Sequence, residues 1–293
     1  MKVTFCISVG GVDRKYVYNL VEKFKSQTNK NFKLILQDND DSGVDQRLFN
    51  ECNSIENYLY DKFVCTGLSE SRNRCALLAD TDYIHYLDDD IEIKEDFSAS
   101  VLNSLSENDT ALVISGKTLP KWESDRPDWL SDNILQMLSI VDFGASKLKF
   151  KEKGFSWLAG VNFIVKRDAL LNFGGFPLRL GRSCFDKSLL SNEENFLVQN
   201  IWKNGGEIIY DPNVLVEHYI KEYQTTRDWV SKRVAWQAVS DFLSGEEWYS
   251  ELENEEVLIK DSCFSIYNQE DFNFENYLTK VKFLCYKMLE GKV

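Results

Sequence analysis

The chain of 293 residues is poor in proline and histidine, and it has no excess of positive charge. Only four prolines accompany 43% hydrophobic and 13% aromatic residues, which excludes a linker-rich chain and predicts an ordered globular protein with a large core. A net charge of −13 argues against a protein that binds nucleic acids through their backbone, because binding to backbone phosphates requires clustered lysine and arginine. One nucleotide can still bind where a metal ion and a few arginines offset its phosphates.

Cysteine pairs, zinc-ligand spacings and long apolar runs are also missing. The seven cysteines are odd in number and include no Cys-x-x-Cys pair, which favours reduced thiols in a cytosolic protein. His85 and His218 are the only histidines and have no zinc-ligand spacing. Met1 and Lys2 lead directly into a strand, and no apolar run approaches the ~20 residues of a membrane span. We therefore expect a soluble, cytoplasmic protein that can still work beside a membrane.

Three adjacent carboxylates follow a hydrophobic strand near the end of the first third of the chain. The segment from Tyr83 to Leu87 is typical of a strand, and Asp88, Asp89 and Asp90 come directly after it. Adjacent carboxylates repel one another, so such a strand end favours a bound cation, and hard oxygen ligands favour Mg²⁺ or Mn²⁺. A divalent ion at the edge of a sheet indicates a protein that holds a diphosphate. A solvated turn is the alternative interpretation.

Strands and helices alternate along the first 115 residues. Val3 to Val9 alternates like a strand, Tyr16 to Phe24 has one apolar helical face, and Phe32 to Leu36 is a second strand. A further helix that ends at Ala79 precedes the strand before the aspartates. This order predicts an α/β fold with a mostly parallel central sheet flanked by helices. Ligands collect at the carboxyl ends of such strands, where Asp38 and the three aspartates fall.

The second half of the chain is less regular. The alternation lapses between Gly116 and Phe155, where a helix is expected near Ile134 to Val141. A strand up to Val165 follows, and later a helix opens at the pair Glu193 and Glu194. Two short strands are expected before His218. From Gly245 onward the chain has eleven acidic residues and five lysines, and this stretch is typical of a helical appendix.

The order of these motifs resembles an inverting family 2 glycosyltransferase of the GT-A fold, from residue 1 to about residue 240. The parts that carry it are the first strand, an Asp after the second strand, a Ser-Arg-Asn helix, the Leu-Asp-Asp-Asp run, a Gly-x-Asn strand with Arg-Asp-Ala-Leu, a Gly-Gly-Phe, an acidic pair that opens a helix, and a late Val-x-His. The resemblance implies a metal-dependent transfer of a sugar from a nucleotide sugar, first of all a UDP-sugar, to a hydroxyl of a glycan or lipid-linked acceptor. Bacterial surface-polysaccharide assembly is the setting by family analogy alone.

The same resemblance divides the chain by role. Residues 1–115 would form the nucleotide-sugar-binding half, and residues 116–244 the acceptor-binding and catalytic half of the same GT-A domain. Residues 245–293 would be an acidic helical appendix. The segment 116–156 and the appendix are expected to define the acceptor. The protein would meet a lipid-linked acceptor at the cytosolic membrane face through peripheral contact, or act on a soluble acceptor.

For the metal site, the resemblance implies Mn²⁺ or Mg²⁺ at the aspartate run. Asp90 is the expected direct ligand, because the third Asp reaches furthest past the strand. Asp88 is expected to contact the ribose hydroxyls, and Asp89 to act through a water or shape the turn. His218 resembles the late histidine that joins the metal or the diphosphate, with a purely structural histidine as the alternative.

For the nucleotide, the resemblance implies three further residues. Asp38 would accept the uracil imide N–H, and Val9 would contribute its backbone. Arg72 would bind the pyrimidine or a phosphate through its rigid donor fork. The alternatives are an ordinary Asx turn for Asp38 and a surface salt bridge for Arg72.

An inverting transfer needs a general base opposite the leaving group. By the resemblance Glu194 is the base and Glu193 supports it. Because family members commonly have Asp in the second place, the choice between the two stays open, and acids that merely complement a helix dipole are the alternative.

Aromatic and amide groups are the candidates for contacting a sugar. Trp157 and Asn162 would line the acceptor or donor sugar, because aromatic faces stack on sugar rings, with core packing as the alternative. Lys232, Arg233 and Trp236 loosely resemble the basic-aromatic helix that grips the diphosphate in polysaccharide synthases. For these three residues, a solvated helix face is the favoured interpretation.

Other function classes have less support. A nucleotidyltransferase shares the sheet and the diphosphate chemistry, but Gly10 and Gly11 imitate its phosphate loop poorly, and it would leave the acidic pair without a role. A dinucleotide oxidoreductase lacks its Gly-x-Gly-x-x-Gly after the first strand. A non-catalytic saccharide-binding module is the third class. Loss of nucleotide binding without Asp90, and of turnover alone without Glu194, would distinguish a transferase from it.

Overall fold

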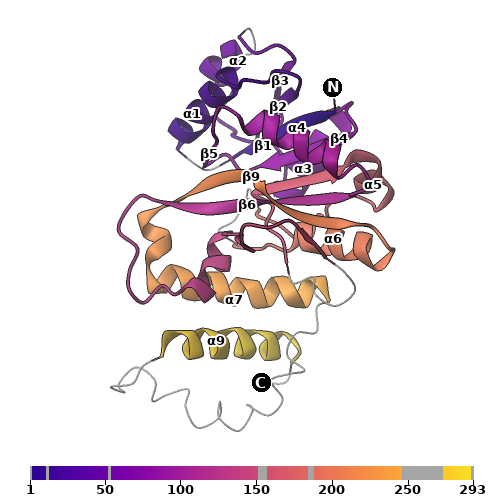
Figure 1. The fold of residues 1–293 in the computed structure, drawn as a ribbon. Coiled ribbons are helices and arrows are strands. Elements are labelled where there is room, and N and C mark those ends of the chain that lie inside the picture. The colour runs from indigo at the N-terminus through magenta and orange to yellow at the C-terminus, as the bar shows by residue number, and fades with distance from the viewer. Residues whose placement is uncertain are drawn as a thin grey trace.

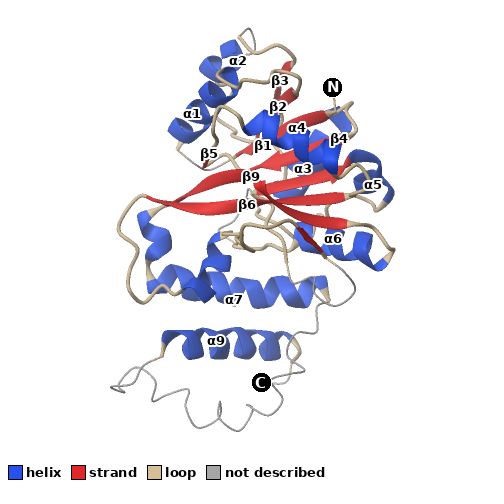
Figure 2. Cartoon of the chain, in the orientation of Figure 1, coloured by secondary structure: helices blue, strands red, loops and turns tan. Residues whose placement is uncertain are grey.

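The computed structural model describes residues 2–10, 13–51, 54–150, 157–183, 188–245 and 273–291. A central sheet carries helices on both faces, and α7 and α9 run side by side beneath it (Figures 1 and 2). The strands are β1 Val3–Val9, β2 Lys33–Asp38, β3 Tyr58–Lys62, β4 Tyr83–Leu87, β5 Ile91–Glu92, β6 Val113–Trp122, β7 Leu148–Lys149, β8 Asn162–Lys166 and β9 Ile208–Ile220. The helices are α1 Arg14–Lys25, α2 Gln46–Glu51, α3 Leu68–Leu78, α4 Phe97–Glu107, α5 Arg167–Asn172, α6 Glu193–Lys203, α7 Arg227–Ser244 and α9 Phe274–Leu289, with the 3-10 turns η1 Asp132–Leu138 and η2 Glu222–Thr225.

The sheet is mixed, in the order β3-β2-β1-β4-β8-β6-β9-β5, with β7 on β9. The expected parallel arrangement holds for β1 with β2 and β4, and for β2 with β3. Strand β8 runs antiparallel to β4, because Asn162 at its start pairs with Leu87 at the end of β4. The chain therefore enters β8 from the edge where β4 ends, and β8 separates the parallel N-terminal strands from β6 and β9.

Both faces of the sheet are buried, which explains the apolar strands. On one face, side chains of β1 such as Phe5 and Ile7 pack against apolar residues of α1, α2 and α4. On the other face, Cys6 packs with residues of α3, α5 and α6. Alternate residues of one strand thus serve two cores, as expected for a sheet covered by helices on both sides.

Two strands differ from the sequence-based expectation. A strand was expected at Ala111 to Ile114, but β6 runs from Val113 to Trp122, because β9 pairs alongside it as far as Ile220. Strand β9 is one strand of 13 residues where two short strands were expected. The register shifts between Gly116 and Lys117, so a bulge accommodates Pro212 within the strand. The helix expected near residues 134–141 is the 3-10 turn η1.

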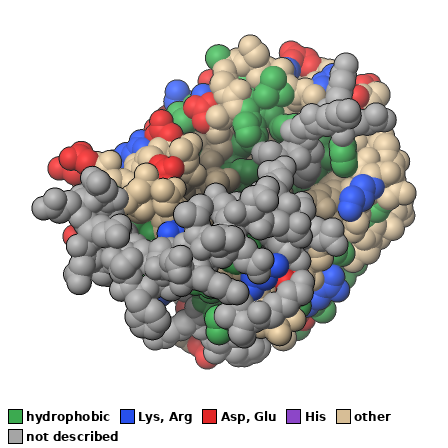
Figure 3. Space-filling model, turned by 90° about the horizontal axis from the view of Figure 1, so that it is seen from below, with side chains coloured by type: hydrophobic (Ala, Val, Ile, Leu, Met, Phe, Trp, Pro, Cys, Tyr) green, Lys and Arg blue, Asp and Glu red, His purple; other side chains and the backbone are tan. Residues whose placement is uncertain are grey.

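The C-terminal helix α9 closes a third apolar cluster with α7 and η1. Phe274 and Leu278 of α9 pack with Val230 and Val234 of α7 and with Ile134 of η1. The expected helical appendix is therefore helical at 274–289, and residues 246–272 lie outside the described part. Figure 3 views this side, where acidic, basic and hydrophobic side chains are interspersed among the described residues. No helix in the described part is long and apolar enough to span a membrane.

Candidate active site

Strand register brings the predicted nucleotide residues to one edge of the sheet. Val9 at the end of β1 pairs with Asp38 at the end of β2, and Ile7 pairs with Leu87 at the end of β4. Because these strands are parallel, Asp38 and the aspartate run that begins at Asp88 leave the sheet at the same edge.

A two-residue strand joins the aspartate run to His218. In β5, Ile91 pairs with His218 of β9, and the Tyr219 N–H donates to the Asp90 carbonyl at 3.0 Å. Asp90 Oδ1 consequently lies 3.2 Å from His218 Nε2. One ligand atom from each of Asp88, Asp90 and His218 lies within 4.8 Å of the others.

The chemistry of these three residues fits a hard divalent cation. His218 Nδ1 donates to the Leu138 carbonyl at 3.0 Å, which turns Nε2 toward Asp90, 3.2 Å away. Burial lowers the pKa of His218, but Asp90 outweighs it and raises that pKa, so Nε2 also carries a proton toward Asp90. A cation would take the place of this proton on Nε2. Two carboxylates and an imidazole could hold Mn²⁺ or Mg²⁺. Burial opposes ionisation of Asp90, but His218 and Lys221 outweigh it and hold the pKa of Asp90 well below its usual value. Lys221 contacts the second Asp90 oxygen.

Asp89 faces away from this cluster. Its Oδ2 accepts the Gly10 N–H at 3.1 Å, so it ties the end of β1 to the aspartate run. Burial and the neighbouring Asp90 raise the pKa of Asp89. The structure thus gives Asp89 a contact that shapes the turn.

Asp38 is covered by side chains of its own half. Its carboxylate is 0% exposed and receives hydrogen bonds from Arg14 Nη2 at 2.9 Å and the Tyr60 hydroxyl at 2.5 Å. It also accepts the Asp40 N–H at 3.0 Å, as in the Asx turn considered from the sequence. Burial opposes ionisation, but Arg14 and Tyr60 keep the pKa of Asp38 below its usual value. The Val9 carbonyl accepts the Asn39 N–H at 2.9 Å.

Arg72 links the aspartate run to the acidic pair. Its Nη1 donates to Glu193 Oε1 at 2.7 Å, and its Nη2 donates to Asp88 Oδ1 at 3.3 Å. The guanidinium carbon lies 6.0 Å and 5.7 Å from the ring centroids of Tyr86 and Phe176. With its side chain only 4% exposed, Arg72 is a buried bridge, and the surface salt bridge considered from the sequence is wrong.

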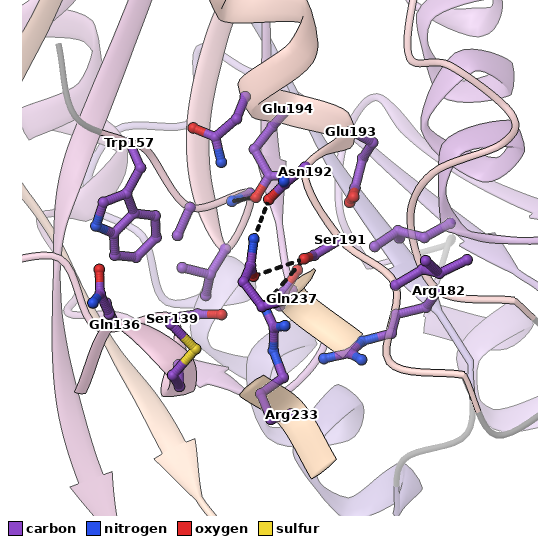
Figure 4. Close-up of a pocket in the computed structure, with 18 of the residues that line it drawn as sticks. Gln136, Ser139, Trp157, Arg182, Ser191, Asn192, Glu193, Glu194, Arg233 and Gln237 are labelled. Carbon is purple, nitrogen blue, oxygen red and sulfur yellow. Dashed lines mark hydrogen bonds between the residues drawn. The ribbon is translucent and has the colours of Figure 1, made fainter. Parts of the chain in front are cut away.

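A cavity of about 310 Å³ lies beside this bridge, between α6, α7 and the segment before β8 (Figure 4). Asp88 and Arg72 line it, and so do Glu193, Glu194 and Trp157. The structure therefore brings Asp88, predicted to contact the ribose, and both candidate bases to one cavity.

The two glutamates have different surroundings. Glu193 Oε1 is held by Arg72, whereas Glu194 Oε1 accepts only the Gly160 N–H, at 2.9 Å. The second oxygen, Oε2, of both Glu193 and Glu194 is buried without a hydrogen-bond partner among the described residues. Burial and the adjacent charge of Glu193 raise the pKa of Glu194 to about 8. Glu194 therefore has an available oxygen and a high proton affinity.

Comparison with known proteins decides the family. Residues 7–174, more than half of the chain, match the sequence profile of "Glycosyl transferase family 2". The chain belongs to this family. The matched region contains the aspartate run and Arg72, while Glu193, Glu194 and His218 lie beyond it.

Similar proteins agree that the chain is a glycosyltransferase. It is 24% identical over 242 residues to the glucosyl-dolichyl phosphate glucuronosyltransferase of Haloferax volcanii, covering 82% of this chain and 76% of that protein. It resembles residues 1–349 of S. aureus TarS in complex with UDP at a TM-score of 0.53 and 14% identity, covering 87% of this chain and 74% of that one. It also resembles GalNAc-T7 with UDP, GalNAc and Mn²⁺ at a TM-score of 0.53 and 14% identity, covering 89% of this chain and 54% of that one. These structural similarities establish the GT-A-like fold alone.

The two residues expected at a sugar have different places in this family 2 glycosyltransferase. Trp157 lines the cavity and also a neighbouring one of about 550 Å³. Asn162 is 1% exposed and is not among the residues that line either cavity. Its amide contacts His85 Nε2 at 2.8 Å and donates to the carbonyls of Lys117 at 3.0 Å and Val214 at 2.9 Å. These partners use the hydrogen-bonding capacity of the Asn162 amide. Asn162 therefore packs in the core, which was the alternative considered from the sequence.

Several residues of the glycosyltransferase site escaped the sequence reasoning. Lys221 and Arg182 carry no pattern that marks them, and each reaches its place only through tertiary contacts. Gly160 leaves room for Arg72, because a methyl group there would lie 2.4 Å from Arg72 Nη2 and displace the guanidinium group. Arg233 was expected on a solvated helix face, but it is 8% exposed and lines the cavity. Its position in α7, which packs under the sheet, is what buries it.

Proposed function

We propose that the protein transfers a sugar from a UDP-sugar to an acceptor hydroxyl with inversion at the anomeric carbon, and that the reaction depends on Mn²⁺ or Mg²⁺. The observation that carries this proposal is the cavity that Asp88, Arg72 and Glu194 line together, in which Arg72 contacts Asp88 at 3.3 Å. A donor and an acceptor sugar can meet there, between a cation site and a base.

The donor side of the proposal rests on Asp88, Asp90 and His218. A divalent cation held by them would act as a Lewis acid on the diphosphate leaving group. The structural relatives support this choice, since one was solved with UDP and another with UDP, GalNAc and Mn²⁺. Asp88 then serves the cation rather than the ribose alone, because it shares the cluster with Asp90 and His218.

The acceptor side of the proposal rests on Glu194 as general base. Its free Oε2 takes the proton of the acceptor hydroxyl while that oxygen forms a bond to the anomeric carbon. The bond from this carbon to the phosphate oxygen breaks in the same step, and its electron pair leaves with the diphosphate. Glu193 is less suited, because its Oε1 is held in an ion pair with Arg72 at 2.7 Å. A base whose pKa lies near the working pH combines availability with proton affinity.

The similar protein of Haloferax volcanii supports a proposal for the acceptor class. That protein is named for action on glucosyl-dolichyl phosphate. We propose a lipid-linked saccharide acceptor, whose sugar stacks on Trp157, with peripheral contact at the membrane face. A soluble glycan acceptor would use the same cavity.

Calorimetric titration of UDP with and without Mn²⁺ tests the proposal on wild type, Asp90→Ala and Glu194→Gln. We expect UDP binding that requires both Mn²⁺ and Asp90. Glu194→Gln should bind UDP like wild type but lose turnover by about 10²–10⁴-fold, the usual contribution of a general base. Binding of UDP without any dependence on metal or Asp90 would contradict the donor site. Unchanged turnover in Glu194→Gln would exclude Glu194 as base.

A further inference from the structure

Two arginines from distant parts of the chain face the same cavity. Arg182 lies in the loop after α5, and Arg233 lies in α7. Figure 4 shows both guanidinium groups turned toward the same part of the cavity, across from Trp157. Nη1 of each is buried and has no hydrogen-bond partner among the described residues. Buried guanidinium N–H groups without acceptors are costly, so they point to a ligand that supplies acceptors.

The backbone fixes Arg182 in this position. Gly181 before it has a φ of +85°, and any side chain there would crowd Ser69 Oγ at 2.9 Å and the Glu193 carboxylate at 3.2 Å. The Arg182 carbonyl accepts the Leu68 N–H at 2.8 Å, so the loop is tied to the start of α3. A glycine turn and a backbone hydrogen bond thus present the arginine to the cavity in advance of any ligand.

A polar network fixes Arg233 in the same way. Its Nη2 donates to Ser191 Oγ at 3.1 Å, and Ser191 Oγ donates in turn to Gln237 at 3.1 Å. Gln237 donates to Asn192 Oδ1 at 2.8 Å, directly before the acidic pair. One nitrogen of Arg233 is therefore used to orient the side chain, and the other is left toward the cavity.

Three acids act on Arg233: the proposed base Glu194, and Asp241 and Glu193, which have partners elsewhere. Glu193 is paired with Arg72, and Asp241 lies 2.7 Å from Lys282 Nζ of α9. Burial and the charge of Arg182 together lower the pKa of Arg233 to about 9. Two like charges held close in a buried cavity favour an anion between them.

We propose that Arg182 and Arg233 form a subsite for an anionic group, a carboxylate or a phosphate, carried by one of the two sugars. The substrate of this transferase is then an acidic saccharide, which deepens the proposed function and rests on it. Planar guanidinium forks match carboxylate and phosphate oxygens and discriminate against a neutral hydroxymethyl group. The anion comes either from a uronic acid donor or from an acidic acceptor.

Paired probes that differ only in this group test the subsite. In the donor arm, calorimetry with Mn²⁺ compares UDP-glucuronate with UDP-glucose. In the acceptor arm, with Mn²⁺ and UDP present, methyl glucuronide and glucose 1-phosphate are compared with methyl glucoside. We expect wild type to prefer the acidic probe by tenfold or more in one arm, and that arm identifies the source of the anion. Arg182→Gln and Arg233→Gln, in different elements, should each remove the preference and change UDP affinity less than twofold.

Three results would overturn the subsite. Wild type could bind acidic and neutral probes equally in both arms. Both variants could keep the preference. Both variants could also weaken UDP itself by as much as the acidic probe, in which case the arginines bind the diphosphate. Failure of the proposed function looks different, because UDP would then show no metal-dependent binding to wild type. Circular dichroism and urea unfolding show whether each variant is folded, and two independent positions keep the test valid if one is not.

Discussion

Replacement of Glu194 by glutamine should stabilise the protein while it abolishes turnover, and the gain should grow with pH. Burial and Glu193 raise the pKa of Glu194 from 4.5 to about 8. Below pH 4.5 the carboxyl is protonated in both the folded and the unfolded chain, so the protonated carboxyl makes its full contribution to the free energy of unfolding there. As the pH rises through 8 the folded protein must ionise it in a buried site, and that contribution is lost.

The magnitude follows from the two pKa values. Each pH unit between them corresponds to about 1.36 kcal/mol. Ionisation of Glu194 therefore lowers the free energy of unfolding of wild type by at most about 5 kcal/mol above pH 8 and by about 3 kcal/mol at pH 7. Glutamine has no charge to bury, and its carbonyl can still accept the Gly160 N–H that Glu194 accepts at 2.9 Å. Urea unfolding of wild type and Glu194→Gln at pH 5, 7 and 8.5 measures the difference in the free energy of unfolding.

Glu193→Gln is the matched control, because it changes the same atoms one residue away. It removes the charge that pairs with the buried Arg72 at 2.7 Å, so it should destabilise the protein by about 3–5 kcal/mol at pH 5. The loss should be smaller at pH 8.5, because the charge of Glu193 no longer opposes ionisation of Glu194. The reasoning is refuted if Glu194→Gln gains nothing at pH 8.5 over pH 5, or if both variants shift stability in the same direction.

Three further substitutions have definite expected outcomes. Gly160→Ala should lower turnover by tenfold or more, measured at saturating donor, because the methyl group would lie 2.4 Å from Arg72 Nη2; normal turnover would mean that Arg72 can move freely. Asn162→Ala should lower the free energy of unfolding by about 2–4 kcal/mol in urea, because it strands buried polar partners, and an altered acceptor KM would contradict this purely internal role. Trp157→Ala should raise the acceptor KM about tenfold without changing UDP affinity by calorimetry; a change in UDP affinity alone would place it at the donor.

The edge of the sheet that carries Asp38 and the aspartate run, here called the donor edge, could be predicted because its sequence patterns are local. A hydrophobic strand followed directly by Asp88, Asp89 and Asp90 places the acids at a strand end whatever the rest of the fold does. The alternation of β1 is equally local, and its predicted range of Val3–Val9 agrees with the structure. Two short strands were predicted where the structure has β9, and the pairing of β9 with β6 through a bulge keeps it continuous past Pro212.

The contacts that define the site depend on partners far away in the chain. His218 reaches Asp90 through a pairing between the two residues of β5 and a long C-terminal strand, which no periodicity reveals. Asp38 was correctly placed at the end of β2, but nothing in its surroundings in sequence shows that Arg14 and Tyr60 cover it. Asn162 at a strand start looks the same whether it faces a ligand or the core.

Arg72 explains why the two glutamates differ although they are adjacent. It contacts Asp88 at 3.3 Å and Glu193 at 2.7 Å, so a single buried cation serves both the donor edge and the start of α6. After burial, the adjacent charge of Glu193 is one cause of the raised pKa of Glu194, and the charge of Arg72 partly offsets it. A chain of contacts thus connects Asp88 at the donor edge, through Arg72 and Glu193, to the proposed base. A substitution at Arg72 should therefore disturb donor binding and the acidic limb of the pH–rate profile together, whereas Asp90 substitutions should disturb donor binding alone.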